Sequence, residues 1–198
     1  AGNVYVAYYN ASGNKIVRKL DVNGNEIWSK TDVGYARGIA VDSVGNVYVG
    51  YESGKTVRKL DVNGNEIWSK TDVGGAHGIA VDSAGNVYVA HYNPSGNKTV
   101  RKLDANGNEI WSKTDVSNAF GIAVDSAGNV YVAHYLTSGK TVRKLDANGN
   151  EIWSKTDVGG TQGIAVDSVG NVYVAYNNPS GNKTVRKLDG NQYFQIVG

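Results

Sequence analysis

The sequence has no cysteine and no methionine, and only two prolines and three histidines among its 198 residues. Without cysteine there can be no disulfide framework, no thiolate nucleophile and no cysteine zinc site, and three histidines argue against a histidine-rich metal cage. No apolar run approaches the length of a membrane-spanning helix. The 20 basic and 18 acidic residues leave a net charge of +2, which is too balanced for electrostatic binding of nucleic acid. We therefore expect no nucleic-acid or membrane partner, no cofactor and no metal site.

What the sequence does contain is an internal repeat. The segment GNVYV begins at Gly2, Gly45, Gly85, Gly128 and Gly170, at spacings of 43, 40, 43 and 42 residues. The segments GIAVD, VRKLD and EIWSKTDV recur in the same phase. A period in this range is typical of repeat architectures such as propellers.

Each unit predicts four short strands, GIAVD, GNVYV, VRKLD and EIWSK, which we call A, B, C and D in that order. The segments are rich in β-branched and aromatic residues, and DS-x-G or NGN turns separate A from B and C from D. A four-stranded antiparallel meander repeated about five times is typical of β-propeller blades. We predict an all-β, single-domain propeller of about five blades over residues 1–198. Its units would be residues 1–37, 38–77, 78–120, 121–162 and 163–198.

The motifs resemble known propeller repeats. GIAVDSAGNVYVA resembles the A and B strands of NHL and bacterial propeller repeats, and LDANGNEIWSK is similar to the tryptophan motif of quinoprotein-type blades. The resemblance implies the propeller fold. It implies no single function, because such propellers serve as enzymes, lectins and scaffolds.

The strand count has one irregularity. The chain begins at a B strand, so the first blade should lack its inner A strand, and a last segment, residues 193–197, should run in the D direction. The edge from Asn3 to Tyr9 would then be unpaired. A truncated chain, a five-bladed ring with one three-stranded blade, and a second chain completing a larger ring all remain open, and self-association through this edge is one expected partner interaction.

Most charges belong to the repeat. Of 20 basic residues 19 fall in repeated columns, and of 18 acids 17 do; the exceptions are Arg37 and Glu52. The repeated charges and Trp28 with its equivalents are interpreted as blade construction. The column of Asp42 could hold a cation on the axis or accept turn amides, and DVNGNE could be part of a calcium loop or a hairpin turn; we favour the turns.

The connections that vary between units are the candidates for function. The residue before GIAVD is Arg37, His77, Phe120 or Gln162, and the B-strand ends and B-C loops also differ. In a meander both sets lie at the same end of the sheets, so they should share one face. Tyrosine, asparagine and serine on rigidly held loops suit sugar or peptide recognition. The residues predicted to bind a ligand at the pore mouth are Arg37, His77, Phe120 and Gln162. The loop tyrosines Tyr35, Tyr8, Tyr51 and Tyr176 would lie further out as stacking platforms, and His91 and His134, which replace tyrosine at an equivalent position, are further ligand-binding candidates.

Catalysis is not expected. No GxSxG, HExxH or phosphate-cradling loop is present, although the histidines near the variable face raise a general-base or metal alternative. We predict a non-catalytic, lectin-like or protein-binding module, with a secreted or surface location favoured. The alternatives are a structural module that assembles into a larger ring without a small ligand, a repeat scaffold of evolutionary or engineered origin, and simple drift of exposed loops.

Overall fold

The computed structural model describes most of the chain, with gaps at several connections. The described ranges are residues 2–9, 15–31, 35–52, 57–71, 75–92, 99–116, 118–134, 141–156, 160–177 and 183–188. They contain 18 strands and no helix that could span a membrane.

The strands are short, of four to seven residues each. They are β1 (Val4–Tyr9), β2 (Lys15–Leu20), β3 (Glu26–Lys30), β4 (Ala36–Val41), β5 (Val47–Tyr51), β6 (Val57–Leu60), β7 (Glu66–Lys70), β8 (Gly75–Val81), β9 (Val87–Tyr92), β10 (Val100–Leu103), β11 (Glu109–Lys113), β12 (Ala119–Val124), β13 (Val130–His134), β14 (Val142–Leu145), β15 (Glu151–Lys155), β16 (Gly160–Val166), β17 (Val172–Asn177) and β18 (Lys183–Leu188).

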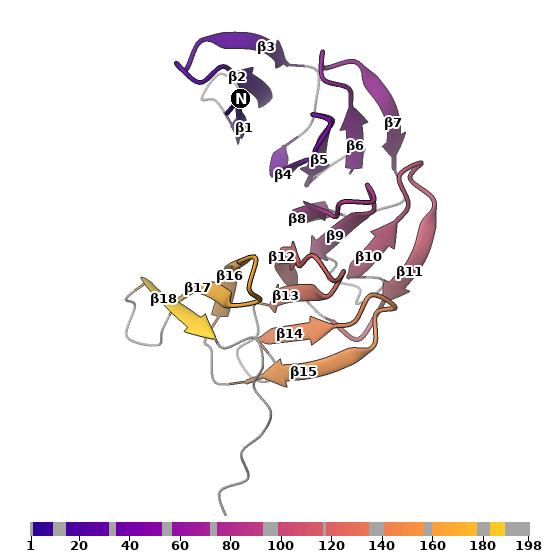
Figure 1. The fold of residues 1–198 in the computed structure, drawn as a ribbon, viewed down its shortest axis with the longest axis vertical. Coiled ribbons are helices and arrows are strands. Elements are labelled where there is room, and N and C mark those ends of the chain that lie inside the picture. The colour runs from indigo at the N-terminus through magenta and orange to yellow at the C-terminus, as the bar shows by residue number, and fades with distance from the viewer. Residues whose placement is uncertain are drawn as a thin grey trace, which may run out of the picture.

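The strands form five antiparallel sheets placed side by side along an open arc (Figure 1). In the three middle sheets the inner strand is β4, β8 or β12, and the chain proceeds outward as a meander to β7, β11 or β15. Within the described residues the first sheet contains only β1–β3 and no inner strand, as predicted, and the propeller fold is confirmed. The fifth sheet contains β16–β18 within the described residues, and the predicted strand at residues 193–197 lies outside them.

The turns are stabilised by hydrogen bonds to aspartate side chains, and asparagine and glycine complete them. Asp42 accepts hydrogen bonds from the backbone N–H of Asn46 at 2.8 Å, from the Asn46 side chain at 2.8 Å and from the Tyr48 hydroxyl at 3.1 Å. Burial works to raise the pKa of Asp42, but these donors outweigh it and hold the pKa below its usual value. Asp21 likewise accepts the backbone N–H groups of Asn23 and Asn25, each at 2.8 Å, while Gly24 takes a φ of 85°. Both aspartate columns therefore build hairpin turns, as favoured from the sequence.

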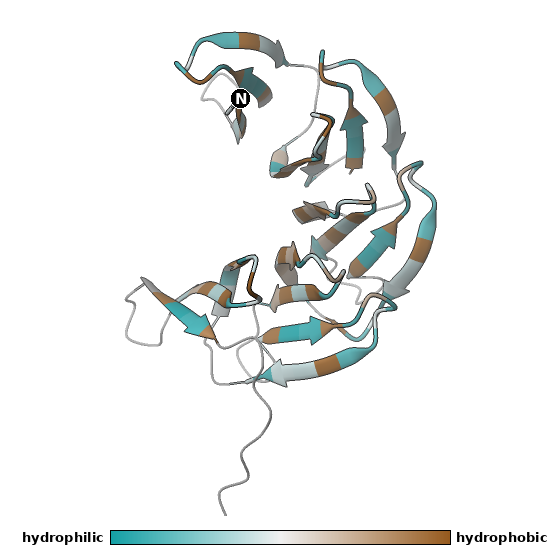
Figure 2. Cartoon of the chain, viewed as in Figure 1, coloured by the Kyte–Doolittle hydropathy of each residue, from teal (hydrophilic) through white to brown (hydrophobic). Residues whose placement is uncertain are grey.

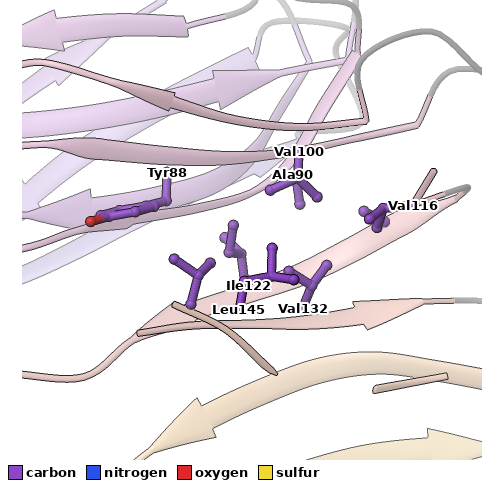
Figure 3. Close-up of a cluster of buried hydrophobic side chains, with 9 residues drawn as sticks. Tyr88, Ala90, Val100, Val116, Ile122, Val132 and Leu145 are labelled. Atoms are coloured by element: carbon purple, nitrogen blue, oxygen red, sulfur yellow. The ribbon is translucent and has the colours of Figure 1, made fainter. Parts of the chain in front are cut away.

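The core lies between neighbouring sheets. One cluster joins Tyr88 and Val100 of the third sheet to Ile122, Val132 and Leu145 of the fourth (Figure 3). Because both faces of a middle blade are covered in this way, every residue of β5 and of β13 is buried. The outer strands are half exposed, and Figure 2 shows hydrophobic and hydrophilic segments following one another along them.

A second contact between blades is polar and repeats three times among the described residues. Lys59 lies 5.2 Å from the centre of the Tyr48 ring, and Trp68 meets the same ring edge-on at 6.2 Å. The Lys59 ammonium and the Trp68 indole N–H then donate to one acceptor, the Ala105 carbonyl in the Asn-Gly turn of the next blade, at 3.2 and 3.0 Å. The same pair of donors reaches Val62 O from the first blade and Ala147 O from the third.

The repeated arginines and glutamates also pair within the frame. In each of four blades the arginine of the C strand contacts the glutamate of the D strand: Arg18 with Glu26, Arg58 with Glu66, Arg101 with Glu109 and Arg143 with Glu151. These contacts agree with the interpretation of the repeated charges as blade construction.

The close approach of adjacent inner strands gives a stability prediction. A Cβ added to Gly78 would lie 2.6 Å from Phe120 O of the next blade, whereas at the equivalent Gly163 it would meet only Ala175 Cβ at 3.6 Å. We expect Gly78→Ala to lower the free energy of unfolding by about 1–3 kcal/mol, because the clash is with backbone. Gly163→Ala should be neutral or slightly stabilising. Denaturant unfolding of both variants tests this, and equal effects would contradict it.

Candidate functional site

The four variable residues occupy a shared structural position that the sequence did not indicate. Arg37, His77, Phe120 and Gln162 were predicted to lie in the connections between D and A strands, but they lie within the inner strands β4, β8, β12 and β16. In each strand the pairing register shifts across this residue, for example between Ala36 and Gly38. Each of the four is thus the extra residue of a β-bulge. A bulge frees a side chain from the regular alternation of a strand and lets it point in a new direction.

The bulges of neighbouring blades lie next to one another. A Cβ added to Gly38 would come within 2.9 Å of His77 O, and one added to Gly121 would come within 2.9 Å of Gln162 O. The same relation holds between Gly78 and Phe120 O, at 2.6 Å. The four bulge residues therefore follow one another along the inner side of the arc, in the order Arg37, His77, Phe120, Gln162. We call this row the bulge row.

At one end of the bulge row, Arg37 pairs with Glu52. The Arg37 Nε and Nη2 atoms both donate to Glu52 Oε2, at 2.9 and 2.6 Å. The two side chains are 51% and 41% exposed, so the pair contributes little to stability, on the order of 0–1 kcal/mol. Together with Tyr35 and Ala36 they line a pocket of 290 Å³. The two charges that stand outside the repeated columns are therefore partners.

In the middle of the bulge row, His77 and Phe120 form an aromatic pair. The ring centres are 4.9 Å apart and the planes meet at 76°, which is the edge-to-face arrangement that aromatic rings favour. Burial lowers the pKa of His77 below 6.5, the positive charge of Arg37 lowers it further, and Glu52 partly opposes the shift. His77 is therefore neutral at pH 7. Gln162, at the far end, is exposed and supplies an amide.

The other predicted residues divide by exposure. The Tyr35 ring is on the surface, at 43% exposure, and its carbonyl accepts the backbone N–H of Glu52 at 2.8 Å. Tyr8 and Tyr176 are half-buried.

Three predicted residues need a correction. The side chains of Tyr51, His91 and His134 are only 0%, 0% and 1% exposed. Tyr51 is therefore not an exposed stacking platform, and the two histidines present almost no surface to a ligand. The reason lies in the pairing: they stand opposite the alanines that precede the bulges, Ala36, Ala76 and Ala119, at the covered end of each B strand.

Glu52 is a site residue that was not predicted from the sequence. Its signal was present, since it is the one acid outside the repeated columns, just as Arg37 is the one base. The sequence could not show that these two residues are in contact, because Glu52 follows the B strand of its blade and Arg37 lies within the A strand. Apart from residues at their ends such as Glu52, the predicted B-C loops lie outside the described residues.

No metal centre emerges from the described part of the chain. It contains no group of three or more histidine, aspartate or glutamate side chains that could hold an ion. The column of Asp42 is engaged in turn hydrogen bonds, so it forms no ring of open ligands.

Two comparisons with known proteins give matches. The profile of the family described as outer membrane protein assembly factor BamB matches residues 53–195. Among solved structures, a protein of unknown function from Bacteroides caccae matches at a TM-score of 0.65 and 17% identity, over 94% of this chain and 73% of that one. No curated protein matches the sequence. The structural likeness supports the fold alone, and neither match names NHL repeats or a quinoprotein tryptophan motif, which remain predictions.

The bulge row gives a prediction for the titration of His77. Arg37→Gln should raise the His77 pKa toward 6.5, because it removes a neighbouring positive charge, and Glu52→Gln should lower it further. The wild-type protein should lose stability as the pH falls through 6.5, since the unfolded chain then binds the proton more readily than the folded one, and Arg37→Gln should reduce that loss. Histidine NMR titration measures the pKa. Arg58→Gln, in the frame, is the control, and an unchanged His77 pKa in Arg37→Gln would contradict the electrostatic coupling.

Proposed function

The chain belongs to the family described as outer membrane protein assembly factor BamB, and from that premise we propose that it is a non-catalytic recognition module whose bulge row binds an extended polypeptide segment. One observation carries the proposal. Four side chains of different chemistry replace one another at a single bulge position, in a frame whose repeated strand and turn motifs scarcely change.

The chemistry of the bulge row suits a polypeptide. The Arg37–Glu52 pair is exposed enough to exchange partners with charged groups of a ligand, and Gln162 can both donate to and accept from a peptide backbone. The His77–Phe120 pair offers an apolar surface between these two polar ends. An extended segment lying along the row would meet charge, aromatic surface and amide in that order.

The choice between the two predicted ligand classes depends on the family. A factor for assembly of outer membrane proteins, as the family is described, has polypeptides as its partners, which favours a peptide over a sugar. A lectin-like function would use the exposed aromatic faces, of which Tyr35 is the clearest in the described residues. Both classes therefore belong in the first screen.

Binding should depend on the bulge row as a unit. We expect a screen of peptide-library and glycan arrays to yield a peptide ligand. The fourfold variant Arg37→Ala, His77→Ala, Phe120→Ala, Gln162→Ala should bind that ligand at least about tenfold more weakly, because a few central residues carry most of the affinity of an interface. Titration calorimetry measures the change.

The matched control is Val169→Ala, which changes a residue that is 80% exposed in the turn between β16 and β17. It should leave the affinity unchanged. Unaltered binding by the fourfold variant would contradict the proposal, and a sugar ligand bound through the same residues would support the site but change the ligand class.

A second candidate function, assembly of copies into a larger structure, is favoured by the two ends of the arc. Val185 of the fifth sheet is 73% exposed, whereas its equivalents Val17, Val57, Val100 and Val142 are all at 0%. In the interior, Val142 packs against Val172 and Val174 of the following blade. The equivalents of these two residues in the first sheet include Val4, which is 49% exposed. The exposed ends therefore match the faces that pack together inside the chain.

Assembly through these ends predicts a concentration-dependent mass. Light scattering should show it for the wild type, and Val185→Asp should remove it, because a charge would be buried in an apolar contact. Val169→Asp, equally exposed but in a turn, should not. A constant mass of 21.1 kDa for the wild type would exclude this function.

A further inference from the structure

The bulge row contains basic groups and no acidic one. Its members are Arg37, His77, Phe120 and Gln162, in that order along the arc. The acid that pairs with the row, Glu52, is not a member of it, because Glu52 follows β5 whereas Arg37 lies within β4. Charge complementarity therefore favours a ligand that brings a negative group to the row.

Arg37 can hold a second carboxylate without releasing Glu52. Its Nε and Nη2 atoms both donate to the same oxygen, Glu52 Oε2, whereas a guanidinium carries five N–H donors. This chain already contains an arginine that is shared in this way. Arg143 contacts Glu151 and also donates to Asp115 Oδ2 at 2.8 Å. A ligand carboxylate on Arg37 would complete the same arrangement at the surface.

The cavity beside this pair has room for such a group. Its volume is 290 Å³, and Tyr35, Ala36, Arg37 and Glu52 line it. Pockets that enclose a whole small ligand are usually about 300–1,000 Å³, so this one suits a single side chain of a longer segment. Because both members of the ion pair are about half exposed, a ligand can reach them from solvent.

The surroundings of His77 are more positive than negative. Its strand, β8, contacts β4, β5, β9 and β12. The titratable side chains of these strands are Arg37, Tyr48, Tyr51, Tyr88, His91 and Tyr92, and Glu52 follows β5.

Of these groups, the two charged ones act on His77 with opposite sign. Arg37 lowers the pKa of His77 by more than Glu52 raises it. Tyr51 and His91 are buried, and Tyr48 donates its hydroxyl to a turn aspartate. The middle of the bulge row therefore lies in a positive field, which would attract an anionic group.

From these observations we propose that the polypeptide segment bound by the bulge row is acidic, and that one of its carboxylates occupies the cavity beside Glu52, accepts hydrogen bonds from Arg37 and lies near His77. This inference rests on the proposed function and names the charge class of its ligand. From the cavity the segment continues past the edge-to-face rings of His77 and Phe120 toward the amide of Gln162.

A carboxylate near His77 makes binding depend on pH. The negative charge favours the imidazolium form, so it raises the pKa of His77 in the complex. The complex then binds a proton more readily than the free protein, and affinity should rise as the pH falls from 7.5 to 5.5. Ordinary ligand carboxylates stay ionised in this range. We expect a rise of about threefold, which His77→Gln should abolish.

The test uses three array libraries of eight-residue peptides, incubated with the full chain. One central position is glutamate, glutamine or lysine in the respective library, and the other positions are randomised. We expect the strongest binders to come from the glutamate library. The best of them is then titrated by fluorescence anisotropy beside its glutamine and lysine counterparts, which should bind at least about tenfold more weakly, because a hydrogen bond to a charged group contributes about that factor.

Two protein variants place the carboxylate on the chain. Arg37→Gln should remove the difference between the glutamate peptide and its glutamine counterpart. Glu52→Gln should strengthen binding of the glutamate peptide, because it removes a competing negative charge. Both residues belong to an exposed pair that contributes little to stability, so both variants should fold. Val169→Ala is the control and should leave both affinities unchanged.

The outcomes separate this inference from the proposed function. Binders from the lysine library that are lost in the fourfold alanine variant would overturn the acidic ligand but support the bulge row as the site. Equal binding of the glutamate peptide and its glutamine counterpart, or weaker binding by Glu52→Gln, would likewise overturn the acidic ligand alone. Glutamate peptides that bind the fourfold variant unchanged, or no binder in any library, would contradict both.

Discussion

The contact between consecutive blades is the constraint on which the rest of this structure depends. Three such contacts among the described residues combine a buried hydrophobic cluster with a lysine and a tryptophan that share one carbonyl in the next blade's Asn-Gly turn. The carbonyl can be reached only if the turn keeps its shape, and the aspartate and the glycine with positive φ give it that shape. Lysine, tyrosine, tryptophan, aspartate and glycine are therefore fixed together, which explains why these columns repeat along the chain, the tryptophan in four of the five units.

Such a frame leaves few positions free to vary, and the bulge is one of them. In the three middle sheets the residues on either side of it are constrained: the preceding alanine pairs with the B strand, and the following glycine lies against the next blade's backbone. The pairing register of the strand skips the bulge residue, so its side chain can change without disturbing either contact. The frame thus carries different side chains at the same bulge position in successive blades. Glu52, which contacts the bulge residue Arg37, adds a second variable side chain at this site.

Local chemistry was predictable from the sequence and long-range placement was not. The four strands of each unit, both turn types, the structural role of the aspartates and the missing inner strand of the first blade all follow from short motifs, because turn residues and β-branched alternation act over a few residues. The bulges did not follow, since a one-residue shift in pairing leaves no distinct local signal. The burial of Tyr51, His91 and His134 was missed for a related reason: it depends on the neighbouring blade, and the sequence comparison of units could show only that the column varies. The pairing of Arg37 with Glu52 could have been suspected, because they are the only charges outside the repeat.

The central claim is that recognition takes place at the bulge row while the turns only support it. The most direct test measures how the backbone amide chemical shifts of the isotope-labelled chain change when a ligand binds. The account predicts that the shifts cluster at residues 35–38, 76–78, 119–121 and 161–163. Shifts clustered instead at the turns that begin at Asp42, Asp82, Asp125 and Asp167 would contradict it and place recognition on the opposite face of the arc.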